Sequence, residues 1–252
     1  MAFFILGQIK VSLSTNRFHH LFHYILKRTF VIADIHGCIK SLKALIEVQL
    51  QPTHEDQFIF LGDYIDRGPD SKAVINYLIH IKDTFRNSVF LRGNHEQMFI
   101  DAQTSLQAHN RWISNGGEQV MISHGLKNHD HVPYHFQEFI MSTSYYFQDE
   151  RYIFVHAGLN HLAELPLKDY NAMMWIREFD VTKQLTGGRI LIHGHTPTPL
   201  EVIQEQIKNS DTQLEICLDN GCVFKGQREG LGNLLALELQ SNTLFIQKNI
   251  DF

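Results

Sequence analysis

Three short polar motifs lie in the first hundred residues of this chain, each directly after an apolar run. The motifs are Asp34-Ile-His36-Gly-Cys38, Gly62-Asp63-Tyr-Ile-Asp66-Arg67-Gly68 and Gly93-Asn94-His95-Glu96, and the runs are 29–33, 58–61 and 88–91. Short runs rich in Val, Ile, Phe and Leu are typical of buried strands. Open α/β sheets carry their active sites at the carboxyl ends of strands. Asp, His and Asn at three such ends therefore predict a metal-dependent phosphoester hydrolase.

Two further motifs complete a set of metal ligands. His156-Ala-Gly158 follows the apolar run 152–155, and His193-Gly194-His195-Thr196-Pro197 follows 189–192. The candidate ligands are two carboxylates, three imidazoles and one amide oxygen: Asp34, His36, Asp63, Asn94, His156 and His195. This set suits Mn, Fe or Zn better than Ca or Mg. Two ions about 3.5–4 Å apart need a bridging ligand, and the Asp63 carboxylate is the natural bridge.

The composition allows one large globular domain of ordinary type. No linker or low-complexity tract divides the 252 residues, so we expect an N-terminal extension, 1–27, followed by a catalytic domain, 28–252. The formal net charge of −5 argues against a nucleic-acid partner. Three cysteines favour packed free thiols in a reducing compartment: Cys38, Cys217 and Cys222.

No apolar run approaches the roughly 18 residues that span a bilayer. The apolar stretch at Phe3–Leu6 is too short for a signal sequence, and no basic segment precedes it. We therefore expect a cytoplasmic protein, with export by a non-classical route left open. The oligomeric state is left open as well.

The elements that must position the motifs alternate along the first hundred residues. Apolar faces predict helices over Ile39–Leu50 and around 74–79, which gives β-α-β-α-β with parallel strands. We expect a helical middle over 96–147, broken at 115–117 and near Pro133. Strand patterns return at 152–155, 189–192, 214–218, 234–239 and 243–247, and we expect the late strands to be antiparallel with no helices between them. The predicted fold class is α/β, with two sheets packed face to face and helices outside.

Several of these phrases resemble the phosphoprotein phosphatase family of metallophosphatases. The resemblance runs from about Thr29 to the C-terminus and is most specific at 62–68 and 91–96. The chain is most similar to the bacterial and phage-type members, on the stretches 93–98, 112–117, 175–178 and 194–197. The resemblance implies the calcineurin-like metallophosphoesterase fold, a two-sheet β-sandwich flanked by helices.

The resemblance also implies a role for each candidate residue. Asp34 and His36 hold the first metal, Asp63 bridges, and the second metal is held by Asn94, His156 and His195. A metal-bridging hydroxide attacks phosphorus in line, without a phosphoenzyme. His95 is the general acid and Asp66 its orienting partner, while Arg67, Arg177 and Asn94 bind the substrate phosphate. Two Mn²⁺ ions are the expected cofactors, with Fe or Zn as alternatives.

Some assignments keep an alternative. Asp66 could instead cap a turn, and Arg177 could form a surface ion pair. Arg92 could support the ligands from behind, and His193 is expected to be packed and not a ligand. The histidines at 109, 124, 129 and 131 are expected on the surface. The loop 225–233 is longer than the family's usual turn, and Asn220 stands where relatives usually have Thr; the loop either lengthens a hairpin or reshapes the substrate groove.

The expected function is hydrolysis of phosphoserine and phosphothreonine in proteins, with phosphotyrosine left open. The nearest alternative is a dinucleotide polyphosphate hydrolase. Symmetric hydrolases of that class resemble Gly-Asp-Leu-Val-Ala-Arg-Gly and Gly-Asn-His-Asp, whereas this chain has Asp66 and Glu96 at the differing positions. A third alternative is a catalytically inactive metal-binding scaffold, which would have no use for an intact acid and phosphate clamp.

Overall fold

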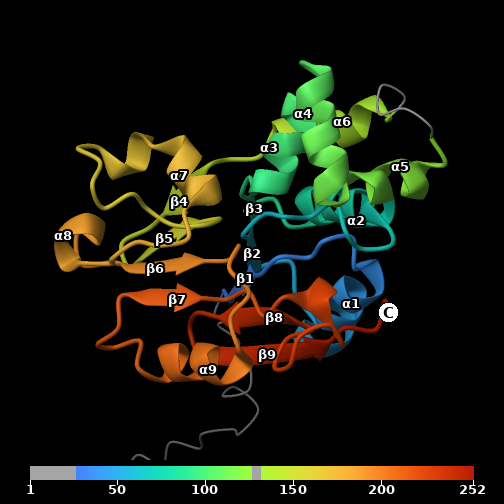
Figure 1. Ribbon diagram of the computed structural model, residues 1–252. Coiled ribbons are helices and arrows are strands. Elements are labelled where there is room, and N and C mark those ends of the chain that lie inside the picture. The colour runs from blue at the N-terminus through green and yellow to red at the C-terminus, as the bar shows by residue number, and fades with distance from the viewer. Residues whose placement is uncertain (1–26, 127–131) are drawn as a thin grey trace, which may run out of the picture.

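The computed structural model describes residues 27–126 and 132–252, and within them the strands form two sheets (Figure 1). The first sheet has the order β3-β2-β1-β8-β9. Its first three strands are parallel, whereas β8 runs antiparallel to β1 and to β9. The strand bounds are β1 Thr29–Ile32, β2 Gln57–Phe60, β3 Val89–Phe90, β8 Asn233–Glu238 and β9 Thr243–Lys248.

The second sheet has the order β4-β5-β6-β7. The strands β5, β6 and β7 are parallel, and β4 is antiparallel to β5. Their bounds are β4 Tyr146–Gln148, β5 Tyr152–Val155, β6 Ile190–His193 and β7 Glu215–Cys217. In Figure 1 these strands lie beside the first sheet, with β7 next to β8.

Helices connect the strands, and α1, α2 and α7 cover the outer faces of the sheets. Helix α1 continues as the π-helical segment η2, and α4 continues through η3 into α5. The α-helices are α1 Ile39–Lys43, α2 Ser71–Thr84, α3 Asn94–Asp101, α4 Leu106–Trp112, α5 Glu118–His124, α6 Tyr134–Met141, α7 Tyr170–Trp175, α8 Lys183–Thr186 and α9 Leu200–Lys208. The remaining segments are η2 Ala44–Leu50, η3 Ile113–Gly117, η5 Pro166–Lys168 and η6 Cys222–Phe224. Figure 1 shows α3 to α6 gathered beside α2.

Alternating side chains of the strands divide the core into layers. Phe30 and Ile32 of β1 pack with Leu42 of α1 in the layer between the first sheet and its helices. The residue between them, Val31, packs instead with Phe154 of β5, in the layer between the two sheets. A smaller cluster covers the outer face of the second sheet with residues of α7. The expected sandwich of two sheets with helices outside is confirmed.

Two expectations about the second sheet were wrong. The end of the expected helical middle, 96–147, instead belongs to β4, in which Tyr146 pairs with Val155 and Phe147 with Phe154 of β5. The later strands β5, β6 and β7 are parallel, with α7, α8 and α9 in their connections. The signal for α9 was present, since Leu200, Ile203 and Ile207 follow helical spacing. The antiparallel pairing of β8 with β9 is confirmed.

The breaks in the helical middle also occur as expected. Gly116 has φ 104°, which kinks the chain between α4 and α5, and Pro133 precedes the first residue of α6. All of the predicted extension 1–27 except Lys27 lies outside the described residues, so the division into extension and domain stays a prediction. Within the described part of the chain, no helix is both long and apolar enough to cross a membrane.

Candidate metal and phosphate site

The five sequence motifs converge at the carboxyl ends of parallel strands from both sheets. Asp34 follows β1, Asp63 follows β2 and Asn94 follows β3, while His156 follows β5 and His195 follows β6. Backbone hydrogen bonds join the connecting loops: the carbonyl of Asp63 accepts from the amides of Ile35 and His36, and Gly194 donates to the carbonyl of His156. The two sheets therefore place one cluster of polar side chains at their shared edge.

Backbone strain is concentrated in these loops. Five non-glycine residues with positive φ belong to the motifs: His36, Asp63, Asp66, Arg67 and His195, with φ between 44° and 70°. L-residues seldom adopt this region, and such residues persist only where the surrounding structure fixes them. Because the motif side chains leave the backbone in these unusual directions, they can turn inward together.

Asp63 lies at the centre of the cluster. Its Oδ2 is 3.4 Å from Nε2 of His36 and 3.9 Å from Nε2 of His95, and its Oδ1 is 3.4 Å from Nε2 of His156. Two groups of close ligand atoms therefore share this carboxylate: His36, Asp63 and His95 form one, and Asp63, His156 and His195 the other. One carboxylate between two ligand groups is the arrangement that a pair of bridged metal ions requires.

A bare nitrogen of His156 faces two other candidate ligand atoms in the second group. Nδ1 of His156 lies 2.9 Å from the carbonyl of Leu61, which fixes the proton on Nδ1 and leaves Nε2 bare. That bare Nε2 lies 3.0 Å from Oδ1 of Asn94 and 3.2 Å from Nδ1 of His195. The lone pairs of His156 Nε2 and of the Asn94 oxygen repel one another unless a cation lies between them, so these residues fit a divalent metal.

His36 is prepared in the same way. Its Nδ1 lies 2.9 Å from the carbonyl of Ile65, so its Nε2 is bare and faces Asp63. Burial, followed by the charge of Arg67, lowers the pKa of His36 well below its usual value. Burial lowers the pKa of His156 too, and burial together with His156 lowers the pKa of His195 to about 3. Neutral imidazoles are the form that binds metal.

Asp34 stands beside the two ligand groups and belongs to neither of them. Its Oδ2 accepts from the amide of His195 at 3.1 Å, but its buried Oδ1 has no hydrogen-bond partner among the described residues. Burial, then the charges of Asp219 and Asp63, raise the pKa of Asp34 well above its usual value. A buried carboxylate oxygen with no donor, next to other carboxylates, is an orphan that a divalent cation would satisfy.

The Asp63 carboxyl behaves differently. Its burial opposes ionisation, but the surrounding imidazoles, His156 first, hold its pKa well below the usual range. Asp63 is thus the fixed negative charge at the centre of the cluster.

His95 and Asp66 form a hydrogen-bonded pair beside Asp63. Nδ1 of His95 lies 2.6 Å from Oδ2 of Asp66, and the indole Nε1 of Trp112 donates to both oxygens of Asp66, at 3.0 and 3.2 Å. Burial opposes a charge on His95, but Asp63 and Asp66 outweigh it and raise the pKa of His95. Its Nε2 is buried and has no hydrogen-bond partner among the described residues. Asp66 therefore contacts the imidazole, as expected, and does not cap a turn through its side chain.

Glu96 has a structural role that the sequence did not reveal: it holds backbone amides of two loops. This fully buried carboxylate accepts hydrogen bonds from the amides of Asp63, Tyr64 and Gly93 at 2.8–2.9 Å. Burial and the charge of Asp63 raise its pKa to about 7. The signal was available, because Glu at the third position of a helix that begins at Asn94 is typical of a capping box.

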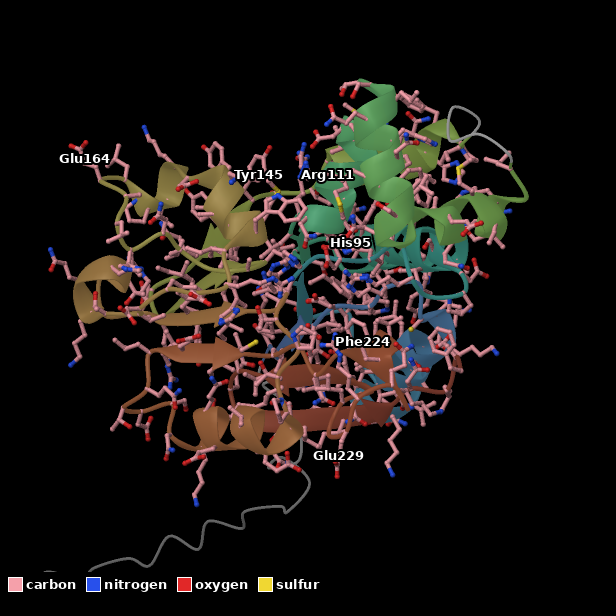
Figure 2. All side chains as sticks on the ribbon, viewed as in Figure 1. His95, Arg111, Tyr145, Glu164, Phe224 and Glu229 are labelled. Carbon is pink, nitrogen blue, oxygen red and sulfur yellow. The ribbon has the colours of Figure 1, made fainter. Side chains whose placement is uncertain are left out.

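The arginines differ in their distance from the cluster. Arg67 is half-buried, and its Nη1 donates to Nε2 of His36 at 2.8 Å. Arg177 is exposed, with Nη1 3.5 Å from the carbonyl of His195 and 3.5 Å from Oγ1 of Thr196. Arg92 points away from the cluster, because it bonds Thr143, Gln97 and Tyr145. Figure 2 shows His95 near the centre of the molecule, with many side-chain nitrogens around it.

The other expected residues lie outside the cluster. His193 is packed, with Nε2 3.1 Å from Oε1 of Glu215, and the three cysteines are buried free thiols. The surface assignment of His109 and His124 was wrong, because both are half-buried; the His124 ring packs edge-on against Phe136. The histidines at 129 and 131 lie outside the described residues.

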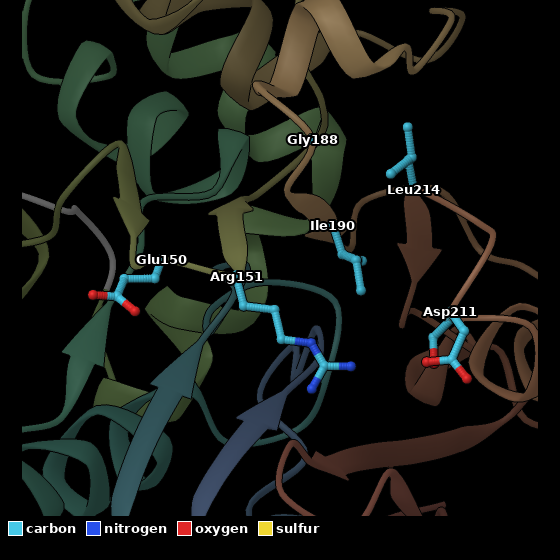
Figure 3. A pocket seen from close by; sticks show the side chains of 7 residues that line it. Glu150, Arg151, Gly188, Ile190, Asp211 and Leu214 are labelled. Atoms are coloured by element: carbon cyan, nitrogen blue, oxygen red, sulfur yellow. The ribbon is translucent and has the colours of Figure 1, made fainter.

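A hollow at the opposite end of the second sheet does not share these features. It is lined at the starts of β5, β6 and β7 by Arg151, Ile190 and Leu214, among others (Figure 3). Its charged side chains are exposed, and it contains none of the predicted ligands. The carboxyl ends of the strands are therefore the candidate site.

The fold and this cluster define a phosphoesterase with ligands for divalent metal ions. The family model for calcineurin-like phosphoesterases matches residues 27–226. The chain belongs to that family and is a metallophosphoesterase, as the resemblance implied.

Known proteins that resemble the chain differ in the activity that their names give. Serine/threonine-protein phosphatase 1 of Salmonella typhimurium is 41% identical over 93 residues, which cover 36% of this chain and 40% of that protein. An asymmetrical bis(5'-nucleosyl)-tetraphosphatase of Oceanobacillus iheyensis is 25% identical over 232 residues, covering 77% of this chain and 84% of that protein. A crystal structure described as a candidate diadenosine tetraphosphatase superposes with a TM-score of 0.60 at 16% identity, over 90% of this chain and 95% of that one.

Replacing Glu96 tests whether its carboxylate holds the site together. Glu96→Ala leaves three buried amides without an acceptor, so the free energy of unfolding should fall by about 3 kcal/mol or more, as measured by urea unfolding. Glu96→Gln keeps one acceptor oxygen and should lose less. A stability of Glu96→Ala within about 0.5 kcal/mol of wild type would show that these hydrogen bonds contribute nothing.

Replacing Asp63 tests the shared carboxylate. Asp63→Asn removes the negative charge between the two ligand groups, so elemental analysis of the purified protein should find fewer than two metal ions per chain. Asp70→Asn is the matched control, because Asp70 caps α2 by accepting from the amide of Ala73 and Asn caps equally well. Two ions in Asp63→Asn would remove Asp63 as the bridge.

Proposed function

We propose that this metallophosphoesterase hydrolyses phosphoserine and phosphothreonine in proteins. The 2.6 Å contact between His95 and Asp66 supports this most directly. It provides an oriented imidazole with a raised pKa, placed beside the shared carboxylate of Asp63.

The rate acceleration that such an imidazole gives as a general acid depends on the leaving group. A serine or threonine phosphoester releases an alkoxide, a strong base that needs a proton as the bond breaks. General acid catalysis of such a step contributes roughly 10²–10⁴-fold. A dinucleotide polyphosphate instead releases a nucleotide phosphate, which is already a stable anion and gains little from an acid. An acid that is held in a fixed orientation is therefore of most use to a phosphomonoesterase. Asp66, which orients this acid, is the residue that the symmetric hydrolases replace.

The remaining residues would bind and orient the phosphate. The planar fork of Arg67 lies against His36 at the edge of the ligand cluster, where it can reach two phosphate oxygens. Arg177 approaches from the His195 side, and Asn94 has its side-chain amide beside His156. Metal ions held by the ligands would supply an activated water and neutralise charge on the phosphate. The mixture of imidazole and carboxylate ligands favours Mn²⁺, with Fe or Zn as alternatives.

A dinucleotide polyphosphate hydrolase is the second candidate function. It is favoured by the Oceanobacillus iheyensis relative, whose match covers more of this chain than the Salmonella typhimurium phosphatase does. The two functions share the fold and the ligands, so the substrate must be determined by measurement.

A substrate panel tests the proposal. The Mn²⁺-loaded enzyme should hydrolyse phosphoserine and phosphothreonine peptides with a higher kcat/KM than diadenosine tetraphosphate, and a phosphotyrosine peptide measures the extent of that third activity. Turnover of diadenosine tetraphosphate with inert phosphopeptides would overturn the proposal. Inertness toward all substrates with metal bound would favour a scaffold.

Replacing His95 tests its use as the acid. His95→Asn should lower kcat on a phosphoserine peptide by roughly 10²–10⁴-fold. The loss on p-nitrophenyl phosphate should be much smaller, because that leaving group needs no proton. The metal content should stay at the wild-type value if His95 is an acid and not a ligand.

The pH profile supplies the control for His95. Asp66 raises the pKa of His95, so the acid stays protonated to higher pH and activity is lost as the pH rises through that pKa. Asp66→Asn should therefore move the alkaline limb of kcat toward lower pH, on the order of one unit. Equal losses of His95→Asn on both substrates, or loss of metal, would contradict the assignment.

A further inference from the structure

The loop 225–232 is anchored at both ends, although it is longer than the turn expected at this position. The side-chain amide of Asn220 donates to the carbonyl of Gly230 at 2.9 Å and accepts from the side chain of Asn233 at 2.6 Å. The ammonium of Lys225 donates to the carbonyls of Asn249 and Phe252. The two departures noted in the sequence thus belong together, because Asn220 holds the longer loop in place.

This loop carries a guanidinium toward the phosphate-binding arginine. Cζ of Arg228 lies 4.9 Å from the centroid of the Phe224 ring, and Cζ of Arg67 lies 5.7 Å from the same centroid. Phe224 is half-buried and packs against the core, so the ring is a fixed platform that both cations approach. In Figure 2 Phe224 lies between His95 and Glu229, so the acidic neighbour of Arg228 lies on the far side of that platform.

Arg228 is exposed, and the described residues offer it no ion pair. A guanidinium held at a fixed place with free donors is suited to bind a carboxylate through two hydrogen bonds. The two ring distances limit the separation of Arg228 from Arg67 to about three residues of extended peptide, at roughly 3.3 Å per residue.

From this geometry we propose that Arg228 is a specificity residue, which binds an acidic side chain within three residues of the phosphorylated residue of a peptide substrate. The proposal rests on the phosphopeptide activity proposed above. It explains what the longer loop does: the loop extends the phosphate site by one further cationic contact, and the preferred substrates are acidic phosphopeptides.

The test compares phosphoserine peptides that differ only in one residue, Asp or Ala, placed in turn at each of the three positions on either side of phosphoserine. At the best position the wild-type enzyme should prefer Asp, by roughly two- to fivefold in kcat/KM, mainly through KM, as for one exposed ion pair. Arg228→Ala should bring the Asp to Ala ratio close to one, and Arg228→Lys should keep part of it. The preference should shrink with added salt.

Arg86→Ala is the matched control, because it also removes one positive charge. Arg86 is exposed and follows the C-terminal end of α2, whereas Arg67 precedes the N-terminal end of that helix. It should keep the wild-type ratio. An equal loss on Asp and Ala peptides in Arg228→Ala would show that Arg228 only supports Phe224, and would overturn the proposal. The proposal would also be overturned if the wild-type enzyme had the same kcat/KM for Asp and Ala peptides. Inert phosphopeptides beside active diadenosine tetraphosphate hydrolysis would overturn the proposed function as well.

Discussion

The carboxylate of Glu96 is the interaction on which the rest of the site depends. It accepts from the amides of Asp63 and Tyr64 in the loop after β2 and from Gly93 in the loop after β3, so one side chain sets the positions of two loops. The effect continues to a third loop, because the carbonyl of Asp63 accepts from the amides of Ile35 and His36. The candidate ligands His36 and Asp63 beside the first sheet are thus placed by a residue that is itself fully buried.

Burying the ionised carboxylate of Glu96 costs desolvation free energy, and this cost raises its pKa. Glu96 is fully buried near the charge of Asp63, and three amide donors offset only part of the desolvation. The same balance recurs at Asp34, whose Oδ1 has no donor at all among the described residues. Several acidic groups held together with neutral imidazoles form a site whose electrostatics favour cations, and this follows from the arrangement without reference to any relative.

The sequence was sufficient to predict which polar side chains gather at one edge, because each follows a short apolar run and the carboxyl ends of parallel strands share one edge. The sequence was insufficient to predict the strand β4 or the residues that contact the site residues. Strand β4 is short, and only its pairing with β5 makes it a strand. The contacts of Asp66 with Trp112 and of Phe224 with Arg67 join residues far apart in the chain, and no local pattern encodes them. The positive φ of His36 and His195 is likewise imposed by tertiary contacts.

The stretch from Trp112 to Gly117 gains a physical account from these contacts. Trp112 donates to Asp66 from the last turn of α4, and Gly116 then turns the chain with φ 104°, a region that side chains disfavour. The carbonyl of Gly116 then accepts from the amide of Arg67 at 3.1 Å. At Gly117 a Cβ would collide with the indole of Trp112. The stretch from Trp112 to Gly117 therefore contacts both the partner of His95 and the backbone of Arg67, which couples the helices beyond β3 to the site they border.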